Sequence, residues 1–246
     1  CKILMKIVGG KGGVIAIEDN KPEAIKVLSA KTDADETLTV RSMPVKYPQG
    51  GEKQLIQALT GREVPSGAAG TADTGVLVQN VNTAVAVFDA VTKGRPLIER
   101  IVTATGDGVE KPGNYSTRIG TPLRHLLTHA GLKKGIKHII CGGPMMGLSA
   151  GSLEMPVQKG TGGILCLSEH PVFANDPCIR CGACVDACPV GLMPQQFSTL
   201  VEAGKFDALK AMNIMDCIEC GSCAYSCPSG RSIVASIRFG KSQAGK

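Results

Sequence analysis

The stretch CIRCGACVDACP at residues 178–189 is repeated, with the same spacing, as CIECGSCAYSCP at residues 217–228. Both copies read Cys-x2-Cys-x2-Cys-x3-Cys-Pro, and together they contain eight of the eleven cysteines in the chain. In this spacing three thiolates bind one iron–sulfur cube, and the fourth binds the neighbouring cube. The repeat therefore predicts two [4Fe–4S] clusters and the transfer of single electrons.

The spacing also assigns the ligands, because each cluster takes its fourth cysteine from the other run. Cluster 1 is predicted to be held by Cys178, Cys181, Cys184 and Cys227. Cluster 2 is predicted to be held by Cys188, Cys217, Cys220 and Cys223. These eight residues are the candidate metal ligands of the chain.

Two other uses of cysteine fit the runs less well. Structural zinc usually takes two separated cysteine pairs, and a third cysteine two residues further on has no place in a tetrahedral knuckle. A disulfide framework would require a small secreted domain, and nothing resembling a secretory signal precedes these cysteines. Free thiols and iron–sulfur runs are instead typical of a reducing cytosol.

Composition bounds the class of protein and its partners. The 246 residues are enough for two or three small domains. The chain contains no run of about 18 apolar residues, which is the length needed to span a bilayer, so any membrane attachment is expected to be peripheral. The net charge of +6 could favour an acidic partner, such as a ferredoxin, or an anionic membrane surface; it could equally reflect ordinary solubility. Aromatic residues make up only 3% of the chain, which leaves few surfaces for stacking on bases, so nucleic acid is not an expected partner.

Residues 1–95 are predicted to form an α/β layer, because strand-like and helix-like segments alternate. The expected strands are residues 13–17, 38–43 and 75–78. The expected helices are residues 20–30, 52–59 and 83–93. Asn20, with Glu23 three residues later, resembles a capping box at the start of the first helix.

Residues 96–167 are predicted to form a small β-grasp-like domain, because a hairpin, a helix and a returning strand follow one another. These segments are residues 97–105 and 115–119, then 121–130, then 137–141. Cys141 and Cys166 lie among apolar residues there and are interpreted as inert core side chains.

Residues 168–246 are predicted to form a two-cluster ferredoxin-type domain, opened by a polar linker at 168–177. The insert between the two runs has helix-like stretches at 195–203 and 206–212. This helical content favours the all-helical ferredoxin type.

Several segments, taken in order, resemble the C subunit family of the Rnf electron-transport complexes. They are YPQGGEKQL at 47–55, LTGREVP at 59–65, QNVNT at 79–83, TGDG at 105–108, PGNY at 112–115, GGPMMG at 142–147 and the doubled cysteine run. The resemblance extends over nearly the whole chain. That family is related to the flavin- and NADH-binding subunit of respiratory complex I, where GTGG at 160–163 also looks similar.

The resemblance implies an NADH- and FMN-binding α/β domain at 1–95, a soluble-ligand-binding β-grasp domain at 96–167 and a two-cluster ferredoxin domain at 168–246. It implies electron transfer between reduced ferredoxin and NAD, coupled to ion translocation, on the cytoplasmic face of the inner membrane. The implied partners are the other subunits of a membrane complex, a ferredoxin-type electron carrier and NAD(H). The implied cofactors are two [4Fe–4S] clusters and FMN.

The same resemblance points to candidate flavin residues. The residues that match the flavin-lining loop and helix start of the complex I relative are Tyr47, Gly50, Gly51, Glu52, Asn80 and Thr83. Family members carry a glycine-rich nucleotide loop and an acidic segment upstream of this region, so we expect an N-terminally truncated chain with an incomplete flavin site. Taken without the family, Gly50 and Gly51 could form a tight turn, and Asn80 and Thr83 could be helix caps.

Two competing functions stay open on the sequence. The chain could be a soluble corrin (cobalamin) reductase of the same family, or a relay that uses its clusters alone because its flavin site is degenerate. No Ser/His/Asp or paired-carboxylate constellation is identifiable, so no catalytic side chain is assigned.

Overall fold

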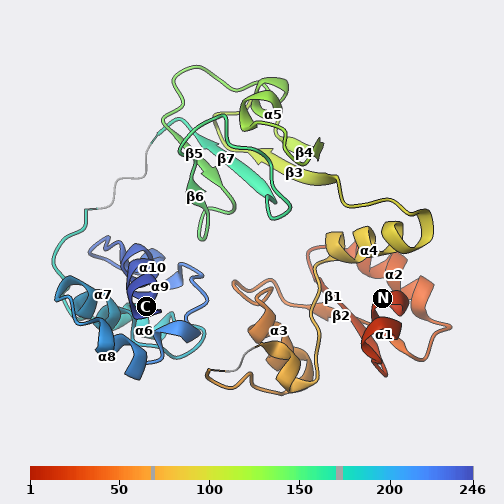
Figure 1. The fold of residues 1–246 in the computed structure, drawn as a ribbon, viewed down its shortest axis with the longest axis horizontal. Coiled ribbons are helices and arrows are strands. Elements are labelled where there is room, and N and C mark those ends of the chain that lie inside the picture. Colours follow the sequence, from red (N-terminus) through yellow and green to blue (C-terminus); the bar gives the residue numbers. More distant parts are fainter. Residues whose placement is uncertain (68–69, 170–173, 246) are drawn as a thin grey trace. The chain divides into compact units, whose positions relative to one another are not determined.

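The computed structural model describes residues 1–67, 70–169 and 174–245. The chain divides into two compact units. The first contains Cys1–Val64 and Ala68–Leu97, and the second contains Pro65–Gly67 and Ile98–Lys246. Helices α1 to α4 belong to the first unit, and all elements from β3 onward belong to the second (Figure 1).

A strand–helix–strand motif forms the centre of the first unit. β1 (Gly13–Glu18) and β2 (Leu38–Met43) pair in parallel, with their first residues opposite each other and their last residues opposite each other. α2 (Pro22–Thr32) connects them and packs on β2. Parallel strands need such a crossover, because a tight turn cannot join their ends. Both predicted strands are confirmed.

Three further helices complete the described part of the first unit, with a short 3-10 turn, η1 (Thr71–Thr74), ahead of the last of them. They are α1 (Lys2–Val8), α3 (Glu52–Thr60) and α4 (Val81–Lys93). α3 and α4 each end at a glycine in the left-handed conformation, which glycine adopts without strain. Ile56 on α3 is the one buried side chain among the described residues of this unit, so its apolar packing is sparse.

Two expectations for the first unit are wrong. Residues 75–78 do not form a strand, and β1 and β2 make up the whole sheet in the described part of this unit. A segment that finds no neighbouring strand has no ladder partners for its backbone groups. α2 begins at Pro22 after Lys21 without a side-chain cap, so Asn20 does not form the expected capping box. Proline at the first helical position already presets the helical φ angle.

The second unit begins with a mixed five-stranded sheet in the order β4-β3-β7-β5-β6. β3 (Glu99–Thr105) pairs antiparallel with β4 (Gly113–Arg118) and parallel with β7 (Gly163–Leu167). β7 pairs antiparallel with β5 (His138–Cys141), which also pairs with the two-residue β6 (Leu148–Ser149). The predicted hairpin and returning strand are confirmed, whereas β6 was not expected.

The core of this sheet lies beneath α5 (Leu123–His129). Most of its buried side chains come from α5, β3 and β7, and they include Leu127, Val102 and Cys166, each fully inaccessible. The loop after β3 packs directly on β7. At Gly106, where φ is +106°, a Cβ atom would lie 2.0 Å from the carbonyl oxygen of Cys166, so a glycine is required there.

The C-terminal part of the second unit is built from helices in the residues that are described. In chain order they are α6 (Ala183–Asp186), α7 (Pro194–Glu202), α8 (Phe206–Ala211), the 3-10 turn η2 (Ile214–Asp216), α9 (Ser222–Tyr225) and α10 (Ile233–Ala244). The all-helical prediction is confirmed. α10 lies beyond the second cysteine run, where the sequence pattern predicts no element.

α10 packs against the insert between the two runs. Its residues Ile233 and Ile237 are buried together with Phe197 of α7 and Leu209 of α8. Gly240 allows the close approach, because a Cβ atom there would lie 2.8 Å from the side chain of Val201. The predicted insert helices therefore share one apolar core with α10 and with Cys223 of the second run.

The architecture is the α/β, β-grasp and helical two-cluster combination that the sequence indicates. The expected domain boundaries near residues 95 and 167 stay predictions. Part of the expected linker at 168–177 lies outside the described residues. Among the described helices, none has the length and apolar character needed to cross a membrane.

Candidate functional site

The two cysteine runs fold into the same local structure. Arg180 and Glu219 stand at the same place in the two runs, with φ angles of 57° and 56°. Gly182 and Gly221 follow with φ angles of 83° and 88°, and each precedes a four-residue helix, α6 or α9. The repeat in sequence is therefore also a repeat in backbone shape.

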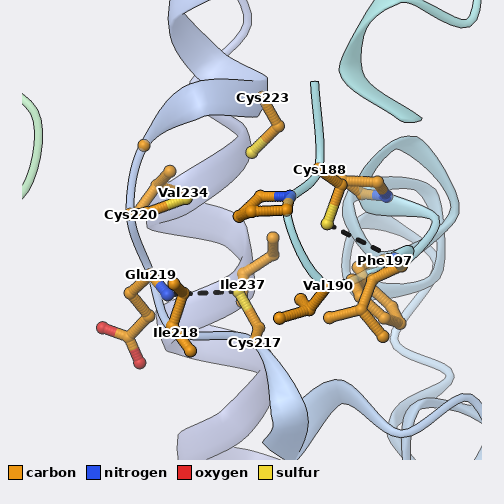
Figure 2. Close-up of a pocket in the computed structure, with 14 residues that line it drawn as sticks. Cys188, Val190, Phe197, Cys217, Ile218, Glu219, Cys220, Cys223, Val234 and Ile237 are labelled. Carbon is orange, nitrogen blue, oxygen red and sulfur yellow. Dashed lines mark hydrogen bonds between the residues drawn. The ribbon is translucent and has the colours of Figure 1, made fainter. Parts of the chain in front are cut away.

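The second run and one cysteine of the first run surround a pocket of about 20 Å³. Its cysteines are Cys188, Cys217, Cys220 and Cys223. Figure 2 shows Cys188 facing this pocket from the first run, opposite the three cysteines of the second run. The rest of the lining is mostly apolar and includes Phe197 and Ile237.

Backbone N–H groups point at two of these sulfurs. The N–H of Glu219 donates to Cys217 Sγ at 3.4 Å, and the N–H of Leu192 donates to Cys188 Sγ at 3.3 Å (Figure 2). Hydrogen bonds to ligand sulfurs stabilise negative charge on them and are one of the terms that set a cluster's potential.

The other four cysteines line a wider pocket, of about 810 Å³. They are Cys178, Cys181, Cys184 and Cys227. Cys178 and Cys181 are exposed, whereas Cys184 is buried and its thiol donates to Gln195 Oε1 at 3.6 Å. Arg231 also lines this pocket, and its guanidinium donates to the carbonyl oxygen of Asp176, two residues before Cys178.

The donor chemistry of both pockets suits iron–sulfur clusters. Each pocket presents four cysteines, three from one run and one from the other. In the described ranges no three His, Cys, Asp or Glu side chains are close enough to hold a single metal ion. The sulfurs are thus spread over the pocket walls instead of meeting at one point.

Burial disfavours the charged form of several of these thiols. It raises the pKa of Cys223 to about 12 and also raises the pKa values of Cys217 and Cys184. At Cys217 the N–H of Glu219 and the ammonium group of Lys241 act in the opposite direction on the pKa. A bound cationic centre would offset this effect of burial by favouring the thiolate form of these three ligands.

The two cysteines outside the runs lie in the β-grasp core, as predicted. Cys166 is fully buried, and burial raises the pKa of its thiol to about 11. Cys141 is partly buried against the same core, and burial raises its pKa as well. Neither lines the two cysteine pockets.

Four of the six candidate flavin residues lie at two helix starts of the first unit. Gly51 is the N-cap of α3 and Glu52 its first residue, and Glu52 accepts a hydrogen bond from the Thr71 hydroxyl. Asn80 is the N-cap of α4, and its Oδ1 accepts from the N–H of Asn82 at 2.9 Å. The cap interpretation of Asn80 is thus confirmed.

Three candidate flavin residues complete this set. Tyr47 is 52% exposed and precedes Pro48 through a cis peptide bond. Gly50 has open space where a Cβ atom would stand. Thr83 is the third residue of α4. None of these residues lines either cysteine pocket, because both pockets are lined by the second unit alone. Their assignment to flavin stays a prediction.

Sequence reasoning missed the charged residues beside the clusters' cysteines. Glu219 sits inside the second run, and Arg238 and Lys241 approach it from α10. Their spacing of three residues places both cations on one face of a helix, which is the signal that could have revealed them. Because no helix was predicted in the region of α10, the spacing of these two cations could not be assigned to a helix face.

Three protein families match parts of the chain. Residues 1–89 match the Nuo51 FMN-binding domain, residues 101–149 match the SLBB domain, and residues 177–231 match the 4Fe-4S dicluster domain. Their order is the order of the three predicted parts.

Curated relatives match nearly the whole chain. The C subunit of the Na(+)-translocating ferredoxin:NAD(+) oxidoreductase complex of Acetobacterium woodii is 45% identical over 245 residues, which is 98% of this chain and 55% of that protein. The C subunit of the proton-translocating ferredoxin:NAD(+) oxidoreductase complex of Clostridium ljungdahlii is 46% identical over 248 residues, or 98% and 53%. The C subunit of the ion-translocating oxidoreductase complex of Erwinia tasmaniensis is 47% identical over 219 residues, or 87% and 27%.

Solved structures share the fold at low sequence identity. A chain of an NAD+-reducing [NiFe]-hydrogenase in the H2-reduced state aligns with a TM-score of 0.60 at 19% identity, over 98% of this chain and 49% of that chain. In the air-oxidized state the TM-score is 0.58 at 20% identity, over 84% and 41%. The chain spans between about a quarter and about half of the length of the curated relatives above. On the strength of its identity to those relatives, the chain belongs to the family of C subunits of the ion-translocating ferredoxin:NAD(+) oxidoreductase complexes.

Proposed function

We propose that this chain is the electron-relay part of such a C subunit and carries electrons between a ferredoxin-type carrier and NAD. The relay consists of two [4Fe–4S] clusters and FMN, and the whole complex couples the transfer to ion translocation. The observation that carries the proposal is the pair of pockets in the second unit. Each pocket presents four cysteines, with one of the four contributed by the other run.

The chain's own residues would hold the clusters and protect them. Cys178, Cys181, Cys184 and Cys227 would ligate cluster 1, and Cys188, Cys217, Cys220 and Cys223 would ligate cluster 2. The N–H groups of Glu219 and Leu192 would hydrogen-bond ligand sulfurs of cluster 2. The apolar side chains of Phe197 and Ile237 would keep water from it.

The first unit would hold the flavin. Bound FMN supplies the exchange between two-electron hydride chemistry and single electrons. The first-turn N–H groups of α3 and α4 have no acceptor within their helix, apart from the Asn82 N–H that Asn80 caps, and such groups suit the flavin phosphate. The residues proposed to contact FMN are Tyr47, Gly50, Gly51, Glu52, Asn80 and Thr83.

The proposed location is the cytoplasmic face of the inner membrane, with attachment through the other subunits of the complex. The support for this location is that the relatives named above are subunits of ion-translocating complexes. NAD(H) is cytoplasmic in the chemistry proposed, so the flavin and its substrate would meet on that side.

A second candidate is a relay that works through the clusters alone. It is favoured by one observation, the single buried side chain among the described residues of the first unit, which gives a flavin site little rigid support. The two candidates agree on the clusters and differ only on FMN and NADH.

Cofactor analysis of protein purified without oxygen tests the proposal. The relay predicts about eight irons per chain, as two cubanes require. Added FMN should bind, and NADH should then bleach the cluster absorbance. Iron without FMN binding or NADH bleaching would select the cluster-only relay. Zinc in place of iron would contradict both candidates.

A further inference from the structure

Three charged side chains meet beside the second cysteine run. Lys241 Nζ donates to the carbonyl oxygen of Cys217 at 2.6 Å and to Glu219 Oε1 at 2.8 Å. Arg238 Nε donates to Glu219 Oε2 at 2.9 Å. Glu219 is thus held by two cations from α10, and its backbone N–H at the same time donates to Cys217 Sγ.

This network is partly withdrawn from water. The side chain of Lys241 is 17% exposed, and those of Glu219 and Arg238 are 29% and 31% exposed. Charges in such positions act through a lower effective dielectric than surface charges, so they influence a neighbouring group more strongly. An ion pair fully in solvent would have little effect.

The first run lacks this arrangement. Arg180 stands where the second run has Glu219, so the two runs differ in charge at the same backbone position. Arg180 itself lines the wider pocket of the first run, and the other arginine there, Arg231, pairs with Glu202 of α7 and donates to the Asp176 carbonyl oxygen, outside the run. A lysine bonded directly to a ligand residue's backbone is therefore a feature of the second pocket.

We propose that Lys241 and Glu219 set the reduction potential of cluster 2, in opposite directions. This rests on the proposed function, in which cluster 2 occupies the pocket of Cys188, Cys217, Cys220 and Cys223. Reduction adds one electron to the cluster, with no bond formed or broken and no proton moved. The added negative charge is stabilised by the Lys241 ammonium group and destabilised by the Glu219 carboxylate.

Glu219 also acts as a positioning residue. Its carboxylate holds Lys241 and Arg238 against the run, and Arg238 Nη2 donates to the carbonyl oxygen of Met146 at 2.9 Å. Glutamine at position 219 keeps the shape and one acceptor oxygen but removes the charge. The charge effect can therefore be separated from the positioning effect.

The test is a redox titration of the full chain, followed by EPR, in three variants. Lys241→Gln should lower the potential of one cluster by about 59 mV, which is a tenfold change in its one-electron equilibrium constant. Glu219→Gln should raise the potential of the same cluster. Lys205→Gln is the matched control, because Lys205 is an exposed lysine at the start of α8, and it should leave both potentials unchanged.

Cluster 2 is identified independently in this experiment. Its signal is the one lost in a Cys217→Ala, Cys220→Ala double variant. If Lys241→Gln fails to assemble that cluster, Glu219→Gln alone decides: a rise in potential supports the inference, and no change or a fall overturns it.

Failure of the inference differs from failure of the proposed function. If the potential of cluster 2 changes in neither Lys241→Gln nor Glu219→Gln, with all irons present, the inference is overturned and the relay stays intact. Shifts of the same sign in both variants would also overturn it. Absence of iron from the unmodified protein would overturn the relay and the inference together.

Discussion

The matched glycines Gly182 and Gly221 allow one prediction to be worked in detail. Both precede the short helix of their run, and both have a positive φ angle, 83° and 88°. They differ in surroundings. A Cβ atom at Gly182 would meet nothing within 4 Å, whereas one at Gly221 would lie 2.5 Å from the carbonyl oxygen of Met145.

The expected costs of alanine at these positions follow from that difference. A side chain in the left-handed region costs about 1–2 kcal/mol in either run. At Gly221 the forced displacement of backbone adds about 1–3 kcal/mol. Because about 1.4 kcal/mol changes an equilibrium tenfold, the extra cost corresponds to a further factor of roughly 5 to 140 in the population of opened chains.

The assay is the rate at which an iron chelator bleaches protein purified without oxygen. Clusters become accessible through local opening, so the bleaching rate follows the opened population. Gly182→Ala should bleach somewhat faster than the unmodified protein, and Gly221→Ala should bleach faster again by the extra factor. Equal rates for the two variants would refute the close packing of Met145 on the second run.

Four further predictions concern the rest of the chain. Ile56→Ala should lower the stability of the first unit by about 2–5 kcal/mol, seen as an earlier thermal transition, because it removes the one buried side chain among that unit's described residues; an unchanged transition would contradict this. Gly106→Ala should strongly reduce soluble expression, since its Cβ atom would overlap the Cys166 carbonyl oxygen; normal yield would show that the loop can move away. Cys141→Ala and Cys166→Ala should leave iron content unchanged. Between the ordinary pKa of 9.0 and about 11, the buried Cys166 thiol keeps its proton while an unfolded one loses it, so stability should fall as pH rises through this window; a rise over this window in urea titrations would contradict the sign.

Elements defined by local pattern could be predicted from the sequence. β2 has the predicted bounds, and α3 and α4 end within one residue of their predicted ends, because alternation and a left-handed glycine C-cap are local properties. The expected strand at 75–78 failed because a strand exists only with a partner, and partners are not visible in a local pattern.

The candidate site, like the fold, could be predicted from the sequence only where a local pattern defines it. The spacing of the cysteines predicted the two quartets that line the pockets. Lys241 and Arg238 could not be assigned to the site, since they reach it only through the packing of α10 on the insert helices. Long-range contacts of this kind depend on tertiary structure, which no spacing rule contains.

The exchange of the fourth cysteine between the runs is the central claim, and double variants test it most directly. Iron is counted in Cys188→Ala, Cys223→Ala protein prepared without oxygen. If these two residues share cluster 2, only that cluster is lost, and about four irons and one cubane EPR signal remain. If each run instead held its own cluster, the same protein would lose both clusters and their iron.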